Sequence, residues 1–258
     1  MAPLRANGAE LLPGSFAPGS YDCAMNISHR NRYLYFVVPK CASATVRLSL
    51  APYTDIGYPV TKGVQHMTIE SFLASEHASL WDAGYFRFSF VRNPYDRLYS
   101  GWLQDRYAST QSPRWKQAKA ALFERVGDDF CRYVVEHVRR ADRIHAWDWI
   151  CWCPMHAFAY RDEALALDFV GRAEDVAGGL AALSERLGVP IAKAEDANVN
   201  VAPTTGLKYL AQYDRATVEV VNEIYADDFR LFGYEMLSPE SFPERISPAG
   251  ASDSPVRG

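Results

Sequence analysis

Two apolar segments, each leading into a loop with one cation and then into a helix-like segment, constrain the fold of this chain most. Residues 33–47 read YLYFVVPKCASATVR, and residues 86–102 read FRFSFVRNPYDRLYSGW. Each begins with aromatic and β-branched residues and few polar ones, which is typical of a strand buried on both faces of a parallel sheet. Strands that alternate with helices predict an α/β fold, here a P-loop-like, three-layer α/β/α architecture with a central parallel sheet.

Helix signals follow both strands. After the first strand, Pro39 ends the extended segment, and the apolar spacing predicts a helix over 44–50. After the second strand, Asn93 can cap a helix and Pro94 suits its first position. The further elements that hydrophobic spacing predicts are helices over 115–140, 174–187 and 214–229, and a third strand over 166–171.

The composition permits one folded domain of moderate size. The chain has 258 residues, of which 48% are hydrophobic and 22% charged, enough to build a sizeable core. Residues 1–30 are expected to form a flexible arm and residues 238–258 a disordered tail, which leaves 31–237 as a single domain. The sequence shows neither a transmembrane segment nor a signal peptide, so we expect a cytoplasmic protein.

Charge and cysteine content narrow the partners and the compartment. The net charge of -4 argues against nucleic acid as a partner. The cysteines are odd in number and irregularly spaced, which favours free thiols in a reducing compartment over a disulfide framework. The oligomeric state is not readable from the sequence. The five cysteines are Cys23, Cys41, Cys131, Cys151 and Cys153.

The first loop, PKCASAT at residues 39–45, lies where a strand meets a helix N-terminus. Unpaired backbone N–H groups and the helix dipole favour an anion there, and Lys40 adds a mobile cation. Ser43 and Thr45 add hydroxyls, and small neighbours let the backbone approach closely. A Walker A loop has its lysine at the helix start, whereas Lys40 opens this loop, which disfavours a kinase or NTPase. The alternative is an ordinary strand–helix turn with an exposed lysine.

The second loop begins with Arg92 at the carboxyl end of a strand, the edge where open α/β sheets bind ligands. Its guanidinium can hold phosphate oxygens in a bidentate fork. Ser100, about two turns into the following helix, can donate a hydroxyl to the same group. The alternatives are a salt bridge for Arg92 and a helix contact for Ser100. Asp96 and Arg97 are expected to act as helix cap and surface charge.

Together the two loops resemble the sulfotransferases that use 3'-phosphoadenosine 5'-phosphosulfate (PAPS). The most similar branch is the family 2-like group of carbohydrate sulfotransferases that contains the heparan and chondroitin enzymes. Two later stretches, LDFVGRAEDVAGGL at 167–180 and EIYADDFRLFGY at 223–234, are also similar to the family. The family patterns PKxxSxT and VRxPxxRxxS match Pro39, Lys40, Ser43 and Thr45 in the first loop, and Val91, Arg92, Pro94, Arg97 and Ser100 in the second.

The resemblance implies a donor and residues that hold it. PAPS would be the donor and adenosine 3',5'-bisphosphate the product, with Lys40 neutralising the leaving phosphate oxygen and Arg92 and Ser100 anchoring the 3'-phosphate. The acceptor is expected to be a hydroxyl of a carbohydrate or glycoconjugate, and no metal is expected. The residues expected around the 5'-phosphosulfate are Lys40, Cys41, Ala42, Ser43, Ala44 and Thr45.

A general base for the acceptor hydroxyl is expected between the two loops. His66 lies in VQHMTIESF, a stretch similar to the one that holds the catalytic histidine of glycosaminoglycan 2-O-sulfotransferases. Imidazole titrates near neutral pH, as a general base should. Glu70 and Glu76 are the fallback bases, and the alternative for His66 is a structural or surface histidine.

The chain also departs from the family pattern. CWCPM at 151–155 stands where the family has HxxPQ, and Asn-Val-Asn at 198–200 stands where it has HLN, which puts the acceptor in doubt more than the donor. His145, Cys151, Cys153 and His156 do not have zinc-site spacing. Trp147, Trp149 and Trp152 suit a core or an acceptor cleft, and Thr204, Thr205 and Lys208 suit a lid.

Three classes of function remain open at this point. The leading hypothesis is a PAPS-dependent sulfotransferase that acts by in-line transfer with a histidine base. A nucleotide or sugar kinase is the second class, and the lysine position in the first loop disfavours it. A non-catalytic nucleotide-binding protein on the same scaffold is the third.

Overall fold

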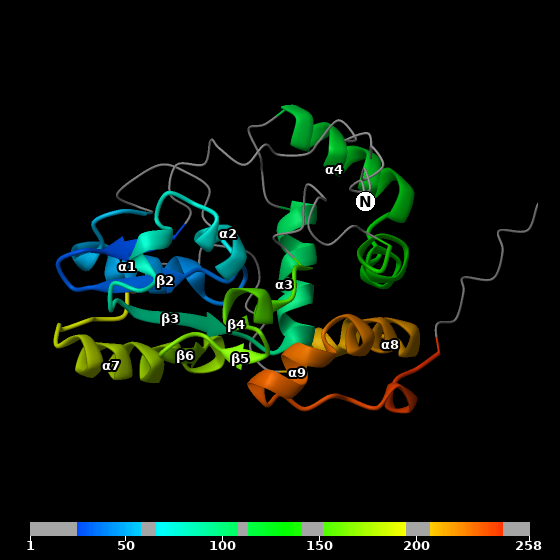
Figure 1. Ribbon diagram of the computed structural model, residues 1–258. Helices are drawn as coiled ribbons and strands as arrows, with labels where there is room; N and C mark the ends of the chain where they lie inside the picture. The colour runs from blue at the N-terminus through cyan, green and yellow to red at the C-terminus, as the bar shows by residue number, and fades with distance from the viewer. Residues whose placement is uncertain (1–24, 58–65, 108–112, 141–151, 195–206, 245–258) are drawn as a thin grey trace, which may run out of the picture.

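A four-stranded sheet lies in one half of the computed structural model, which describes residues 25–57, 66–107, 113–140, 152–194 and 207–244 (Figure 1). The strand order is β1-β2-β3-β6, with β2, β3 and β6 parallel and β1 antiparallel at the edge. The parallel centre of the sheet confirms the predicted α/β class. The strands are β1 Asn26–Ser28, β2 Tyr33–Phe36, β3 Phe86–Val91 and β6 Phe169–Arg172, and a separate hairpin pairs β4 Tyr160–Arg161 with β5 Ala164–Leu165.

Aromatic side chains hold the central strands in register. Tyr35 lies opposite Phe88, and their rings stack with centroids 5.0 Å apart. Phe88 lies opposite Phe169 on β6. All four residues of β2 are buried, as the near-continuous apolar run predicted. The edge strand β1 was not predicted, and it places the last residues of the 1–30 arm in the sheet.

Helices follow the strands as expected, but two long ones are broken. The segment 115–140 is not one helix, because Gly127 has a left-handed backbone (φ 66°) and Asp129 caps a new start. The segment 214–229 is likewise divided at Tyr225. The helices are α1 Ser43–Leu50, α2 Ile69–Leu73, α3 Pro94–Tyr107, α4 Pro113–Val126, α5 Phe130–Arg132 with a π-helix over Tyr133–Val138, α7 Val176–Leu187, α8 Arg215–Ile224 and α9 Ala226–Phe232.

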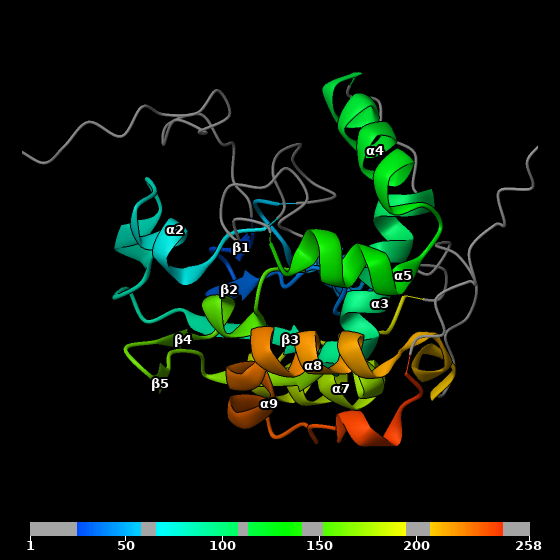
Figure 2. The same cartoon turned by 90° about the vertical axis from the view of Figure 1, so that its right-hand side faces the viewer.

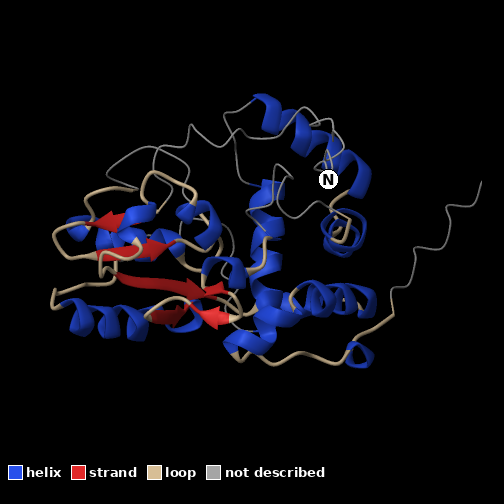
Figure 3. Cartoon of the chain, in the orientation of Figure 1, coloured by secondary structure: helices blue, strands red, loops and turns tan. Residues whose placement is uncertain are grey.

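The molecule has a sheet half and a helical half. Figure 3 shows the strands gathered on one side and most helical segments on the other. One buried cluster surrounds the sheet, and a second joins α3, α5, the π-helix, α8 and α9. Strands β2 and β3 point toward α3, so the carboxyl edge of the sheet faces the helical half, from which α4 extends away (Figures 1 and 2).

The folded region extends past residue 237. A 3-10 turn over Pro239–Ser241 lies against α8, and the Arg215 amide donates to the carbonyl of Pro243 at 3.0 Å. The expected tail is therefore shorter than 238–258 at its start. In the described part of the chain, no helix is both long enough and apolar enough to span a membrane.

Candidate functional site

The two predicted loops meet at the carboxyl edge of the sheet. Parallel pairing of β2 with β3 brings their ends together, and Arg92 Nη1 donates to the carbonyl of Lys40 at 3.2 Å. Met155, in the buried cluster around the sheet, touches both loops: its sulfur accepts from the Arg92 amide at 3.4 Å and from Cys41 Sγ at 3.8 Å. The loops thus form one continuous surface.

The first loop has a strained backbone that presents a helix N-terminus. Lys40 (φ 65°) and Ala42 (φ 56°) are left-handed without being glycine, a conformation that costs on the order of 1 kcal/mol per residue and tends to occur at functional sites. Ala42 is the N-cap of α1, and no side chain caps the helix. Amides at an uncapped helix start can bind an anion, so the predicted anion site stays a prediction.

Side chains of the first loop divide into buried and reachable ones. Lys40 Nζ donates to Gln104 Oε1 on α3 at 3.3 Å. Ser43, at the start of α1, is half-buried. Thr45 is buried. Burial raises the pKa of Cys41 to about 12, so its thiol stays protonated and serves packing rather than chemistry.

Arg92 is already paired with a carboxylate. Its Nε and Nη2 both lie 2.7 Å from Asp96 Oδ2, and the two side chains are largely buried. The salt bridge, which was the alternative interpretation of Arg92 from the sequence, is thus present. It fixes the orientation of the guanidinium at the carboxyl end of β3. Ser100, one turn beyond Asp96, is half-buried on the same helix.

The prediction of a surface role for Asp96 and Arg97 is wrong. Arg97 is only 1% exposed, and its Nε donates to the carbonyl of Pro39 at 3.0 Å. It therefore supports the first loop from within the protein. Pro94 to Leu98, the first residues of α3, are all buried, with Tyr95 and Leu98 in the helical cluster and Arg97 against the first loop.

His66 lies beside the first loop, where the sequence placed the base. Its Nδ1 is 2.8 Å from the carbonyl of Val37, which can only accept, so Nδ1 carries the proton and Nε2 the lone pair. Burial first, and then the charges of Arg47, Arg97 and Lys40, lower the pKa of His66 to about 3, against the backbone hydrogen bond that raises it. The imidazole is neutral at pH 7.

The fallback bases are less well placed. Glu70 and Glu76 are both exposed, Glu76 with 79% of its side chain accessible. Glu70 lines a separate cavity between α2 and the β4–β5 hairpin. Residues 145–151, Thr204 and Thr205 lie outside the described part of the chain, as does the side chain of Lys208, while Trp152 is buried in the helical core.

Two carboxylates that the sequence reasoning did not assign complete the site. Asp228 on α9 is fully buried and accepts from the amides of Met155 (2.7 Å) and His156 (2.8 Å) and from His156 Nδ1 (2.9 Å). Glu174 accepts from the amide of Asn93 at 2.6 Å, directly after Arg92. Both lie in the family-like stretches 167–180 and 223–234, which was the available signal.

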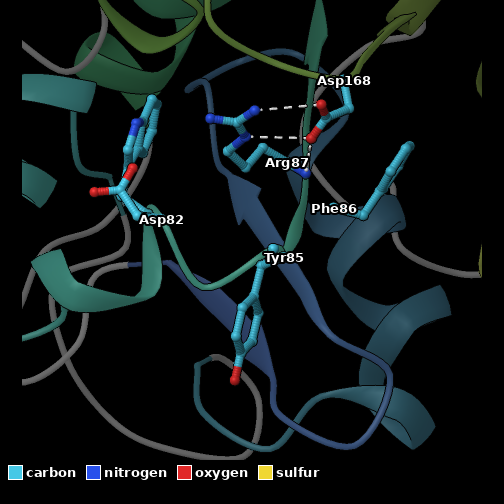
Figure 4. A pocket seen from close by; sticks show the side chains of 7 residues that line it. Asp82, Tyr85, Phe86, Arg87 and Asp168 are labelled. Atoms are coloured by element: carbon cyan, nitrogen blue, oxygen red, sulfur yellow. Dashed lines mark hydrogen bonds and ion pairs between the residues drawn. The ribbon is translucent and has the colours of Figure 1, made fainter.

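A cavity of about 460 Å³ lies at the opposite edge of the sheet, around the start of β3 (Figure 4). Arg87 and Asp168 form a two-point ion pair across it, at 3.2 and 3.3 Å. The guanidinium of Arg87 also stacks over the ring of Trp81, 4.7 Å from its centroid. These polar groups satisfy one another and join β3 to the segment before β6, so we assign them a structural role.

Fold and site define the class of the protein: an α/β protein in which a helix N-terminus and an arginine oriented by a carboxylate meet at the carboxyl edge of the sheet. The sequence model of the sulfotransferase family matches residues 24–235, most of the chain. The chain therefore belongs to the sulfotransferase family. No curated protein and no solved structure gives a significant match to it.

Proposed function

We propose that the protein transfers a sulfuryl group from PAPS to a hydroxyl of a carbohydrate or glycoconjugate. The observation that carries the proposal is the contact between Arg92 and the backbone of Lys40, which joins the two family motifs into one anion-binding surface. A donor with a phosphosulfate at one end and a 3'-phosphate at the other matches two adjacent cationic sites. The family membership supports sulfuryl transfer independently.

The donor would lie along the carboxyl edge of the sheet. The amides at the start of α1 and the hydroxyl of Ser43 would hold the 5'-phosphate, and Lys40 would neutralise charge on the leaving oxygen. Arg92 would take the 3'-phosphate, with Ser100 donating to it. The rest of the phosphate-binding loop would be formed by Thr45 and by the backbone of Cys41, Ala42 and Ala44.

The reaction is an in-line displacement at sulfur. The acceptor oxygen forms a bond to sulfur while the bond from sulfur to the 5'-phosphate oxygen breaks, and the bisphosphate leaves with the electron pair. We assign His66 Nε2 the acceptor proton, because the hydrogen bond to Val37 leaves that nitrogen with its lone pair. An anionic PAPS molecule bound next to Lys40 would offset the positive charges that lower the pKa of His66. The imidazole would then be a stronger base.

Ligand-dependent stabilisation tests the donor site. Adenosine 3',5'-bisphosphate should raise the melting temperature of the protein, whereas ATP and GTP should not, because a ligand that binds only the folded state stabilises it. Arg92→Ala should abolish the shift. Arg87→Ala is the matched control: it removes an arginine and its ion pair from the other end of the same strand and should keep the shift. A response to ATP alone would sink the proposal.

The base is tested by separating binding from transfer. His66→Ala should reduce sulfate transfer from labelled PAPS by about 10²–10⁴-fold, the usual contribution of a general base, and leave bisphosphate affinity within a few-fold. His77→Ala, at a half-buried histidine that begins the 3-10 turn Ala78–Leu80, serves as the control. Transfer by the His66 variant at near the wild-type rate would remove His66 from the mechanism.

A further inference from the structure

The carboxylate that orients Arg92 has one oxygen in use and one without a partner. Asp96 Oδ2 accepts both hydrogen bonds from the guanidinium, at 2.7 Å each. Asp96 Oδ1 is buried and has no hydrogen-bond partner within the described part of the chain. A buried acceptor left unpaired is costly and rare in native proteins, and it calls for an explanation.

The groups around Asp96 leave this oxygen unpaired. Glu174 is an acceptor and already receives the Asn93 amide and the Tyr234 hydroxyl. The pKa of Tyr209 is raised to about 12, first by burial and then by the nearby charge of Asp96. The Tyr209 hydroxyl nevertheless forms no hydrogen bond to Asp96 Oδ1. Burial raises the pKa of Asp96 despite Arg92, as expected for a carboxylate short of donors. A hydrogen-bond donor on a bound ligand would satisfy this oxygen.

The position of Asp96 indicates which ligand group that is. Arg92 is the proposed holder of a phosphate monoester, and Asp96 is bound to the same guanidinium. A ligand group that reaches Asp96 must therefore be adjacent to the phosphate, must donate a hydrogen bond, and must be uncharged or positive. A hydroxyl on the carbon next to the phosphorylated one meets these conditions, and in a nucleoside 3'-phosphate that is the 2'-hydroxyl of ribose.

We propose that Asp96 Oδ1 accepts a hydrogen bond from the ribose 2'-hydroxyl of the donor, so that the site selects ribonucleotide 3'-phosphates over their 2'-deoxy forms. The inference rests on the proposed function, since it requires the 3'-phosphate on Arg92. In this arrangement the guanidinium of Arg92 binds the 3'-phosphate, and the carboxylate of Asp96 accepts a hydrogen bond from the neighbouring hydroxyl. A 2'-deoxy ligand lacks this hydroxyl, so the buried carboxylate of Asp96 would have no hydrogen-bond partner in the complex.

The test compares adenosine 3',5'-bisphosphate with its 2'-deoxy form by calorimetric titration of the full chain. The wild-type protein should bind the ribose form about tenfold more tightly or better, the worth of a hydrogen bond to a charged group. Asp96→Ala should bring the two affinities within about twofold of each other. Asp168→Ala, which removes the partner of Arg87 at the other end of β3, should keep the discrimination.

The outcomes separate this inference from the proposed function. If neither bisphosphate binds, the sulfotransferase proposal fails and the inference fails with it. If the wild-type protein binds both equally well, the donor site stands and the role of Asp96 is overturned, without any variant having to fold. Discrimination that persists in Asp96→Ala likewise overturns the role of Asp96.

Discussion

His66 and His156 have pKa values that their surroundings move in opposite directions. Burial lowers the pKa of His66 to about 3, whereas the hydrogen bond to Asp228 raises that of His156. A depressed histidine resists protonation in the folded state only, so it destabilises the fold as pH falls below about 6.5. A raised histidine contributes stability that is complete below about 6.5 and is lost as pH rises through its folded pKa.

Replacing each histidine should therefore change opposite sides of the pH profile. As pH falls from 6.5 to 5.5, protonation of His66 in the unfolded state should lower the free energy of unfolding by about 1 kcal/mol. The variant His66→Gln should not show this loss. His156→Gln should lower stability below pH 6.5 and have a smaller effect above the folded pKa of His156. Urea denaturation of both variants across this range measures the slopes, and parallel profiles for wild type and His66→Gln would contradict the neutral state of His66.

Arg97 is expected to act on the donor site through the first loop. Arg97→Lys keeps the charge but loses the fixed N–H that reaches Pro39, so we expect a loss of about 1–3 kcal/mol in stability and weaker bisphosphate binding. Arg106→Lys is the control, since Arg106 pairs with Asp128 on the exposed part of the same helix and should change stability by under about 1 kcal/mol. Unchanged bisphosphate affinity in Arg97→Lys would make Arg97 purely structural.

At the level of single residues, sequence reasoning located the loops and missed the supports beneath them. Lys40 and Arg92 were assigned to the loops because each lies in a short motif beside a strand end, and His66 was assigned because its stretch VQHMTIESF resembles a family segment. The sequence predicts a helix cap and a surface charge for Asp96 and Arg97, because an amphipathic helix normally has one solvent-exposed face. That assumption fails at the start of α3, where Pro94 to Leu98 are all buried, and nothing in local spacing signals it.

Among the elements, the strands were easier to predict than the lengths of the helices. An apolar run identifies a buried parallel strand wherever it lies, whereas helical spacing continues through a break such as Gly127. The break itself has a signal, since glycine followed two residues later by a capping aspartate is a stop and a new start. Strand β1 has only three residues and its pairing depends on β2, so local sequence could not define it.

Contact between β3, β6 and α7 depends on two glycines. A Cβ on Gly171 or on Gly179 would lie 2.5 Å from the ring of Phe90, which fills the space between the strand and the helix. Gly171→Ala should therefore cost about 1–3 kcal/mol, typical of an overpacked core, and Gly179→Ala a similar amount. Ala181→Ser, on the exposed face of α7, should stay within about 0.5 kcal/mol in the same thermal denaturation. Wild-type stability in both glycine variants would show that the ring moves aside freely.

The whole molecule consists of two buried clusters joined through the candidate site. Arg97 joins α3 to the first loop, and Met155 contacts that loop while Asp228 binds its amide. The sequence predicted one domain because no linker separates the sheet segments from the later helices. It could not predict that the residues joining the two halves also support the two loops of the candidate site, since that follows from packing between distant segments.

These connections predict a single cooperative unit. Amides of β2 and β3 in the sheet half and of α8 in the helical half should exchange with deuterium at the same opening free energy, equal to that of global unfolding, because neither half keeps its buried contacts alone. Hydrogen exchange by mass spectrometry over a urea series measures this, and adenosine 3',5'-bisphosphate should raise both values by the same amount. If α8 opens at clearly lower free energy than β2 while the sheet remains protected, the halves are separate domains, and ligand binding should then protect only the half that contains its loops.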